Sequence, residues 1–97
     1  MRWTECISDA ISYIEDNITE EITVEGIAKA VHLSPFYFQK GFAMLCEFTV
    51  SDYIRNRRLA LAGVEVAATE GKIIDIALKY GYDSPDSFTK AFSRFHG

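Results

Sequence analysis

Apolar residues recur with helical spacing along nearly the whole chain. Between residues 5 and 17 they fall at positions 7, 10, 11 and 14, the i, i+3, i+4, i+7 spacing of one helix face. This spacing predicts a first helix from about Glu5 to Asn17, with Thr4 as its N-cap. A second helix is predicted after Thr23, because Glu25 would suit the positive end of a helix dipole in the first turn.

Four more helices follow from their own start and stop signals. The third begins at Ser34, a capping residue, with Pro35 at the first helical position, where proline loses no hydrogen bond. The fourth runs from Val50 to Ala68. The fifth runs from about Ile73 to Tyr80 and stops at Gly81, and the sixth starts at Ser84 and Pro85 and reaches about Phe95. Six or seven helices without a strand predict an all-α fold.

The third and sixth helices repeat one pattern 50 residues apart. Residues 34–42 and 84–92 share the skeleton Ser-Pro-x-x-Phe-x-Lys-small-Phe, and an Ile-Ala pair precedes each copy. A short helix, a turn and a capped second helix outline a helix-turn-helix, which places one helix in a major groove of DNA. The long fourth helix, about 27 Å by its rise per residue, would link the two units.

The repeat predicts which face of each reading helix is buried. At 100° per residue the buried stripe holds, in the two copies, Phe38, Gly41, Phe42 and Leu45, and Phe88, Ala91, Phe92 and Phe95. In the fourth helix the buried side is predicted to hold Tyr53, Ile54, Leu61 and Val64. The small residues Gly41 and Ala91 coincide, which predicts a close crossing of the preceding helix in each unit.

The opposite faces carry side chains that can recognise bases. They are Phe36, Gln39, Lys40 and Ala43 in the third helix, and Asp86, Thr89, Lys90 and Ser93 in the sixth. Glutamine can bond adenine, lysine can reach guanine or phosphate, aspartate can accept from cytosine, and phenylalanine can pack on a thymine methyl. Arg55, Arg57 and Arg58 form the densest basic cluster and are candidates for phosphate contacts.

The net charge of −4 opposes binding to nucleic acid, but the acids are unevenly placed. Residues 1–25 hold seven acids and one base, whereas residues 26–97 hold seven acids and nine bases. A DNA-binding face outside the N-terminal segment is therefore compatible with the composition. Neither the cysteines Cys6 and Cys46 nor the two histidines show a metal-ligand spacing, so we expect reduced thiols and neither a metal nor a cofactor.

The combined pattern resembles the AraC/XylS family of bacterial transcription regulators. The residues that carry the resemblance are Ile27, Ala28, Ser34, Phe38 and Phe42, then Tyr53, Ile54, Arg58, Leu59 and Ala62, then Ile73, Ile76, Ala77, Gly81, Tyr82, Ser84, Phe88, Lys90, Ala91 and Phe92. The resemblance implies seven helices, in two homeodomain-like helix-turn-helix subdomains, 1–48 and 69–97, joined by a linking helix, 49–68. It also implies a sequence-specific DNA-binding protein that inserts two helices into adjacent major grooves. We expect a cytoplasmic location, because residues 1–5 do not read as the start of a signal peptide.

The resemblance also assigns positions to the DNA contacts. Base-contacting positions of the family fall on Phe36, Gln39 and Lys40 and on Asp86, Ser87 and Lys90; backbone-contacting positions fall on Ser34, Ser84, Arg55, Arg57 and Arg58. Where the family usually has a glycine after the third helix, this chain has Glu47. The family continues beyond the position of Gly97, so we expect a second subdomain truncated at its C-terminal end. The helical pattern begins within a few residues of Met1, so we expect any effector-binding domain to follow Gly97, and a small, helix-only regulator that ends shortly after this point is the alternative.

Two other classes of function compete with DNA reading. An all-helical module could dock RNA polymerase or another regulator through its acidic N-terminal helix. An enzyme is disfavoured, because the sequence shows no nucleophile–base pair, no metal spacing and no glycine-rich phosphate loop. No apolar run reaches the length of a membrane span. For the DNA reader we expect a monomer on double-stranded DNA, since one chain carries both reading units.

Overall fold

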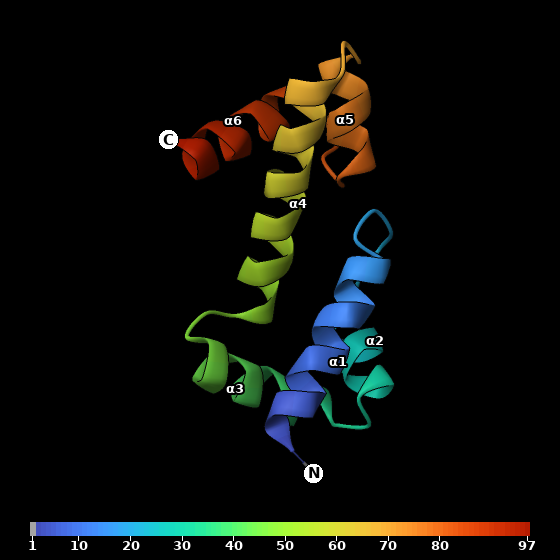
Figure 1. The fold of residues 1–97 in the computed structure, drawn as a ribbon, viewed down its shortest axis with the longest axis vertical. Coiled ribbons are helices and arrows are strands. Elements are labelled where there is room, and N and C mark those ends of the chain that lie inside the picture. Colours follow the sequence, from blue (N-terminus) through green and yellow to red (C-terminus); the bar gives the residue numbers. More distant parts are fainter. Residues whose placement is uncertain (1) are drawn as a thin grey trace. The chain divides into compact units, whose positions relative to one another are not determined.

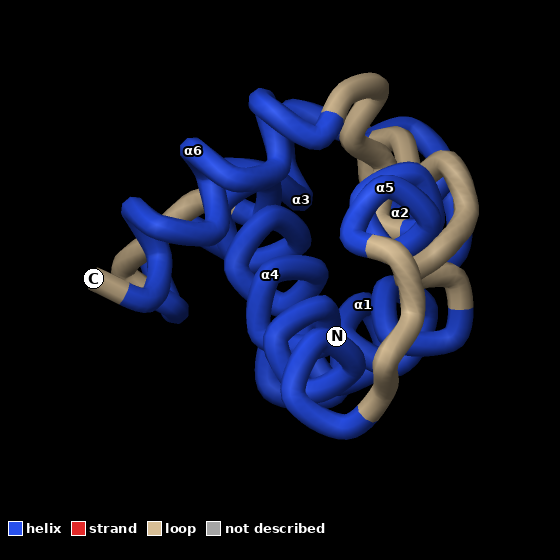
Figure 2. Tube along the Cα trace, turned by 90° about the horizontal axis from the view of Figure 1, so that it is seen from above, coloured by secondary structure: helices blue, strands red, loops and turns tan. Residues whose placement is uncertain are grey.

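The computed structural model describes residues 2–97 and is helical throughout, with no strand in that part of the chain. Its helices are α1 (Trp3–Asp16), α2 (Val24–Ala30), α3 (Pro35–Cys46), α4 (Val50–Ala68), α5 (Ile73–Lys79) and α6 (Pro85–His96), shown in Figures 1 and 2. The predicted all-α class is confirmed. Six helices lie within residues 2–97, and the seventh implied by the family resemblance is not among them.

The chain forms two compact units, Met1–Ile54 and Arg55–Gly97, so the boundary falls inside α4. In the first unit α1 and α3 both contact α2, and the three helices share one hydrophobic core (Figure 1). Its core contains Ala10, Ile14, Ile27, Ala28, Phe38, Phe42 and Val50. Residues of the first turns of α4 pack on this core, which is why the predicted linking helix begins as part of the first unit.

The second unit has its own core, built from the rest of α4, from α5 and from α6. The buried residues are Leu59, Ala62, Ile76, Ala77, Tyr80 and Phe88. The Ile-Ala pair before each recognition helix is buried in both units: Ile76 and Ala77 here, and Ile27 and Ala28 in the first unit. Each helix-turn-helix therefore has an independent apolar support.

Several predicted helix starts are confirmed by hydrogen bonds. The Thr23 hydroxyl accepts from the Gly26 N–H at 3.0 Å, and the Thr49 hydroxyl accepts from the Asp52 N–H at 3.1 Å. The first helix is confirmed, but its predicted N-cap was wrong: the helix begins at Trp3, its N-cap is Arg2, and Thr4 lies in the first turn. Packing of the Trp3 ring against α3 gives the earlier start a tertiary reason.

Three residues predicted to be buried are instead exposed. Leu45 is 55% exposed, Val64 65% and Phe95 39%. Leu45 and Phe95 lie in the last turns of α3 and α6, where they line surface grooves and are not part of the cores. The buried side of the second half of α4 holds Leu59 and Ala62, so the apolar stripe runs along a different side of that helix from Val64.

The turn after α3 uses a residue that is unusual for its conformation. Glu47 is the C-cap of α3 and has φ of 65°, in the left-handed region, and its N–H bonds to the Ala43 carbonyl at 3.0 Å. Phe48 then stacks on Tyr53, and the ring centroids are 6.3 Å apart. The turn therefore keeps the left-handed geometry that glycine would adopt freely, with a glutamate in its place.

We expect Glu47→Gly to stabilise the first unit. Glycine adopts a positive φ without a side-chain clash, whereas an L residue with a Cβ is strained there, so the gain should be about 1 kcal/mol. The midpoint of urea unfolding measures it. Glu70→Gly is the matched control, because Glu70 is exposed and lacks a positive φ. Equal shifts from the two variants would contradict a conformational origin.

Candidate nucleic-acid interface

The first candidate reading face lies on α3. The Ser34 hydroxyl accepts a hydrogen bond from the Tyr37 N–H at 3.2 Å, which caps the helix, and Pro35 occupies its first position. Phe38 and Phe42 are completely buried, so they fix the rotation of α3 about its axis. The predicted reading residues then face solvent, as periodicity indicated.

The structure brings Phe36, Gln39 and Lys40 together around one surface depression. Phe36 is 74% exposed, and the Lys40 ammonium lies 5.6 Å from the centre of its ring, within cation–π range. A large aromatic ring held in water beside an amide and an ammonium is costly for a folded chain alone. It provides an apolar contact and two polar contacts on a single surface, which suits the edge of a base pair.

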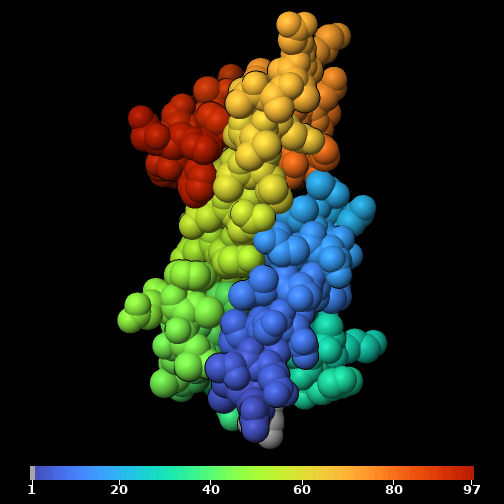
Figure 3. Space-filling model, viewed as in Figure 1, coloured from blue at the N-terminus to red at the C-terminus, as the bar shows by residue number. Residues whose placement is uncertain are grey.

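The second candidate reading face lies on α6, the red helix of Figure 3. The Ser84 hydroxyl accepts from the Ser87 N–H at 3.1 Å, and the two hydroxyl oxygens are 3.0 Å apart. Phe88 is buried and sets the rotation of the helix. Asp86, Ser87 and Lys90 are all exposed in the first two turns, so this face offers acceptors, a hydroxyl and one ammonium.

The predicted arginine cluster does not form a single patch. Arg55 and Arg57 project about half a turn apart on α4, by the helix repeat of 3.6 residues. Arg58 lies near the turn after α5: its Nη1 would be 3.7 Å from a Cβ built on Gly81. Burial raises the pKa of Tyr82, and the positive charges of Arg55 and Arg58 lower it in part. Arg55 and Arg58 therefore both act on Tyr82.

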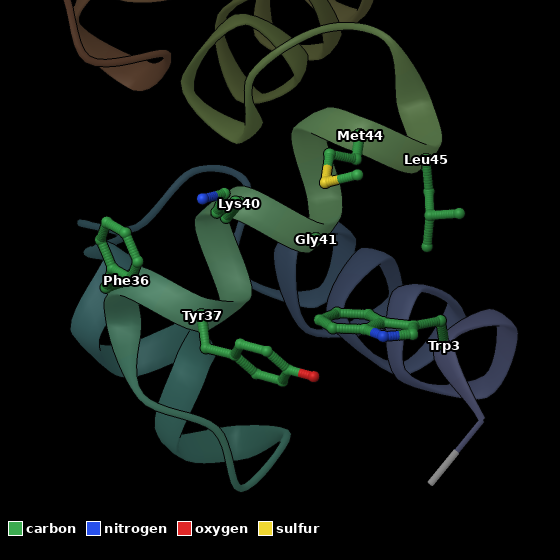
Figure 4. A pocket seen from close by; sticks show the side chains of 7 residues that line it. All are labelled: Trp3, Phe36, Tyr37, Lys40, Gly41, Met44 and Leu45. Carbon is green, nitrogen blue, oxygen red and sulfur yellow. The ribbon is translucent and has the colours of Figure 1, made fainter.

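An apolar groove runs along one side of α3, and sequence reasoning did not find it. This α1–α3 groove, of about 510 Å³, is lined by Trp3 of α1 and, on α3, by Phe36, Tyr37, Lys40, Gly41, Met44 and Leu45 (Figure 4). The Trp3 ring stacks obliquely on Tyr37 at 5.3 Å. Trp3 lies four residues before Ile7 on the apolar face of α1, a spacing that could have identified it.

Trp3 also explains the small residue in the middle of α3. A Cβ added to Gly41 would lie 2.2 Å from the Cη2 atom of the Trp3 ring. The close approach predicted at Gly41 therefore comes from a ring of α1, and the predicted crossing by the preceding helix α2 is wrong. The Trp3 ring thus packs the N-terminal end of α1 against the recognition helix α3.

A second groove lies between α4 and α6. This α4–α6 groove, of about 410 Å³, is lined by Arg55, Asn56, Leu59, Ala91, Arg94 and Phe95. Arg94 was not singled out by the sequence, although it lies seven residues after Ser87 and four after Lys90, on the same side of a helix.

Both cysteines, Cys6 and Cys46, are free thiols, and burial raises their pKa. No helix within residues 2–97 combines the length and apolarity of a membrane span.

Known proteins share this architecture. Residues 27–97 match a family model described as a helix-turn-helix domain. The regulatory protein SoxS of Escherichia coli (strain K12) is 40% identical over 88 residues, which cover 91% of this chain and 82% of SoxS. An AraC-type DNA-binding domain protein from Chromobacterium violaceum has a solved structure that superposes with a TM-score of 0.90 at 25% identity, covering 96% of this chain and 83% of that one.

These likenesses define a helix-turn-helix protein. The chain belongs to the AraC family and is a sequence-specific DNA-binding transcriptional regulator. The fold is also that of the DNA-binding domain of AdpA, whose structure was solved in complex with a target DNA. That domain superposes with a TM-score of 0.82 at 19% identity, covering 93% of this chain and 81% of that one.

We expect Gly41→Ala to displace the Trp3 ring from α3. A methyl group at this position cannot share the space with the ring, even though alanine favours a helix by about 1 kcal/mol over glycine. Because Trp3 is the only tryptophan, its fluorescence reports the change directly, and the emission should shift to longer wavelength as the ring enters water. Gly71→Ala, in an exposed segment, is the control. An unchanged spectrum in Gly41→Ala would contradict close packing of the Trp3 ring on Gly41.

Proposed function

We propose that one chain reads two adjacent major grooves, one with α3 and the other with α6. Phe36, Gln39 and Lys40 contact bases in the first groove, and Asp86, Ser87 and Lys90 contact bases in the second. The observation that carries this proposal is the duplicated geometry. In both units a serine caps the helix, a phenylalanine is buried four residues further on, and the residues between and beyond them are exposed.

Contacts with the DNA backbone complete the proposed interface. We assign them to Ser34 and Ser84 at the two helix starts and to the arginines at positions 55, 57 and 58. Phosphate contacts set the register of a protein on the duplex, whereas base contacts specify the sequence. The helix starts support the assignment, because the helix dipole favours an anion there. A regulator of bacterial DNA acts in the cytoplasm, which is the location we propose.

RNA polymerase is a second proposed partner, and the charge of the first unit favours it. Met1–Ile54 contains three bases and nine acids, a net charge of −6, whereas Arg55–Gly97 contains seven bases and five acids, a net charge of +2. Much of the acidic surface lies along α1 and the loop that follows it, apart from the reading residues of α3. Such a surface suits a basic patch of a protein and repels DNA. Docking of this kind is compatible with DNA reading.

We expect the chain to bind DNA as a monomer on a non-palindromic site. Each chain supplies two different reading helices, so it need not pair with a second copy to cover two grooves about 34 Å apart. Selection of bound duplexes from a random pool would give the site, and sedimentation of the complex would give the stoichiometry. Binding only as a symmetric dimer on an inverted repeat would refute the proposal.

Base-reading and backbone residues should respond differently to substitution. Gln39→Ala should relax the preference at one base pair by about 1–3 kcal/mol, because glutamine can form a bidentate bond to a base. Arg57→Ala should weaken all sequences alike and lower the dependence on salt by about one phosphate contact. Titration of the selected duplex and its single-base variants at several salt concentrations measures both effects.

Lys29→Ala is the control for loss of a charge away from the reading faces, since Lys29 is exposed in the last turn of α2. Lys29→Ala should leave the base preference unchanged. It should also change the slope of log Kd against log salt concentration by less than the value for one phosphate contact. If Gln39→Ala and Arg57→Ala erased base discrimination to the same extent, the division into readers and backbone contacts would be wrong.

A further inference from the structure

The two grooves occupy the same side of the two recognition helices. The repeat pairs Gly41 with Ala91, Met44 with Arg94 and Leu45 with Phe95, and these residues line the α1–α3 groove and the α4–α6 groove respectively. The facing wall comes from the first helix of each unit: Trp3 of α1, and Arg55, Asn56 and Leu59 of α4. The grooves are therefore equivalent features of a duplicated fold.

Their chemistry has diverged. The α1–α3 groove has an apolar wall of Trp3, Met44 and Leu45. The α4–α6 groove is lined by two guanidinium groups and an amide together with the apolar Leu59, Ala91 and Phe95, and no carboxylate is among the described residues that line it. Guanidinium groups are the protein donors best matched to the paired oxygens of a phosphate, and an amide N–H can add a third donor.

The α4–α6 groove also lies beside the proposed base readers. Ser87, Lys90 and Arg94 follow one another at i, i+3 and i+7, so they form one stripe along α6. Ser87 is in the first turn of the helix and Arg94 is in the last. In homeodomains the C-terminal end of the recognition helix contacts the DNA backbone while other residues of that helix read bases. Arg94 has the corresponding place on α6, in the unit with net positive charge.

We propose that the α4–α6 groove binds a phosphate of the DNA backbone, with Arg94 and Arg55 as its cationic donors and Asn56 as a neutral one. The inference rests on the proposed reading of DNA by α6 and adds a contact that sequence reasoning did not assign. The first unit, which has Met44 in place of Arg94, lacks the equivalent contact. The second unit therefore provides more of the salt-dependent affinity than the first unit does.

Arg94→Met tests the groove, because methionine is the residue at the equivalent position of the first unit. The probes are the duplex selected by the parent chain and an unrelated duplex of the same length. We expect weaker binding to both, with the slope of log Kd against log salt concentration lower by about 0.9, the value for one lost phosphate contact. Arg94→Lys should keep the slope, since it keeps the charge.

Lys72→Met is the matched control. Lys72 is an exposed base of the same unit that lies just before α5 and does not line the groove. The inference is overturned if Arg94→Met lowers the slope no more than Lys72→Met does, or if it changes the preference at particular base pairs. If the parent chain bound neither duplex, the proposed function itself would fail, a result distinct from failure of the groove.

The reciprocal variant Met44→Arg should create the missing contact in the first unit. We expect the salt slope to rise by about 0.9 on both duplexes, because a guanidinium then stands at the position equivalent to Arg94. Replacing single phosphates by neutral methylphosphonates would locate each contact. A position sensitive in the parent should become insensitive in Arg94→Met, and a new sensitive position should appear in Met44→Arg. An unchanged slope in Met44→Arg would overturn the equivalence of the two grooves.

Discussion

Burial of a phenylalanine near the start of each recognition helix is the constraint on which the orientation of both helices depends. Phe38 and Phe88 are almost fully enclosed in their cores, so α3 and α6 cannot rotate about their axes without exposing an aromatic ring to water. The orientation of every other side chain on these helices follows from that constraint. The N-capping serines Ser34 and Ser84 fix where each helix begins, and the buried ring fixes which face of the helix is exposed.

Sequence periodicity predicted the helices and the exposed reading faces because both depend on local rules. Caps at Thr23, Ser34 and Ser84 are short-range signals, and each forms the predicted hydrogen bond. The rotation of α3 and α6 could be predicted because the pattern occurs twice, which separates the shared core positions from the variable ones. The assignment of individual bases and phosphates to these residues stays a prediction.

The errors share a physical cause, since each needed knowledge of a neighbour from elsewhere in the chain. Leu45 and Phe95 are on the apolar stripe, but the neighbouring helix leaves an open groove beside each of them and does not enclose it in a core. The role of Gly41 depends on Trp3, 38 residues earlier in the chain. The grooves depend on the first helix of each unit, and no local pattern specifies where that helix lies against the recognition helix.

Two reading helices with different side chains have a consequence for the way the chain sits on a gene. A symmetric dimer looks the same after a half turn, so its two orientations on DNA are indistinguishable. Here one helix presents an aromatic ring with a glutamine and a lysine, and the other presents an aspartate with a serine and a lysine. A chain that read its site as proposed would have polarity. It would point toward one flanking gene and away from the other, and inverting the site would turn its acidic surface to the opposite side.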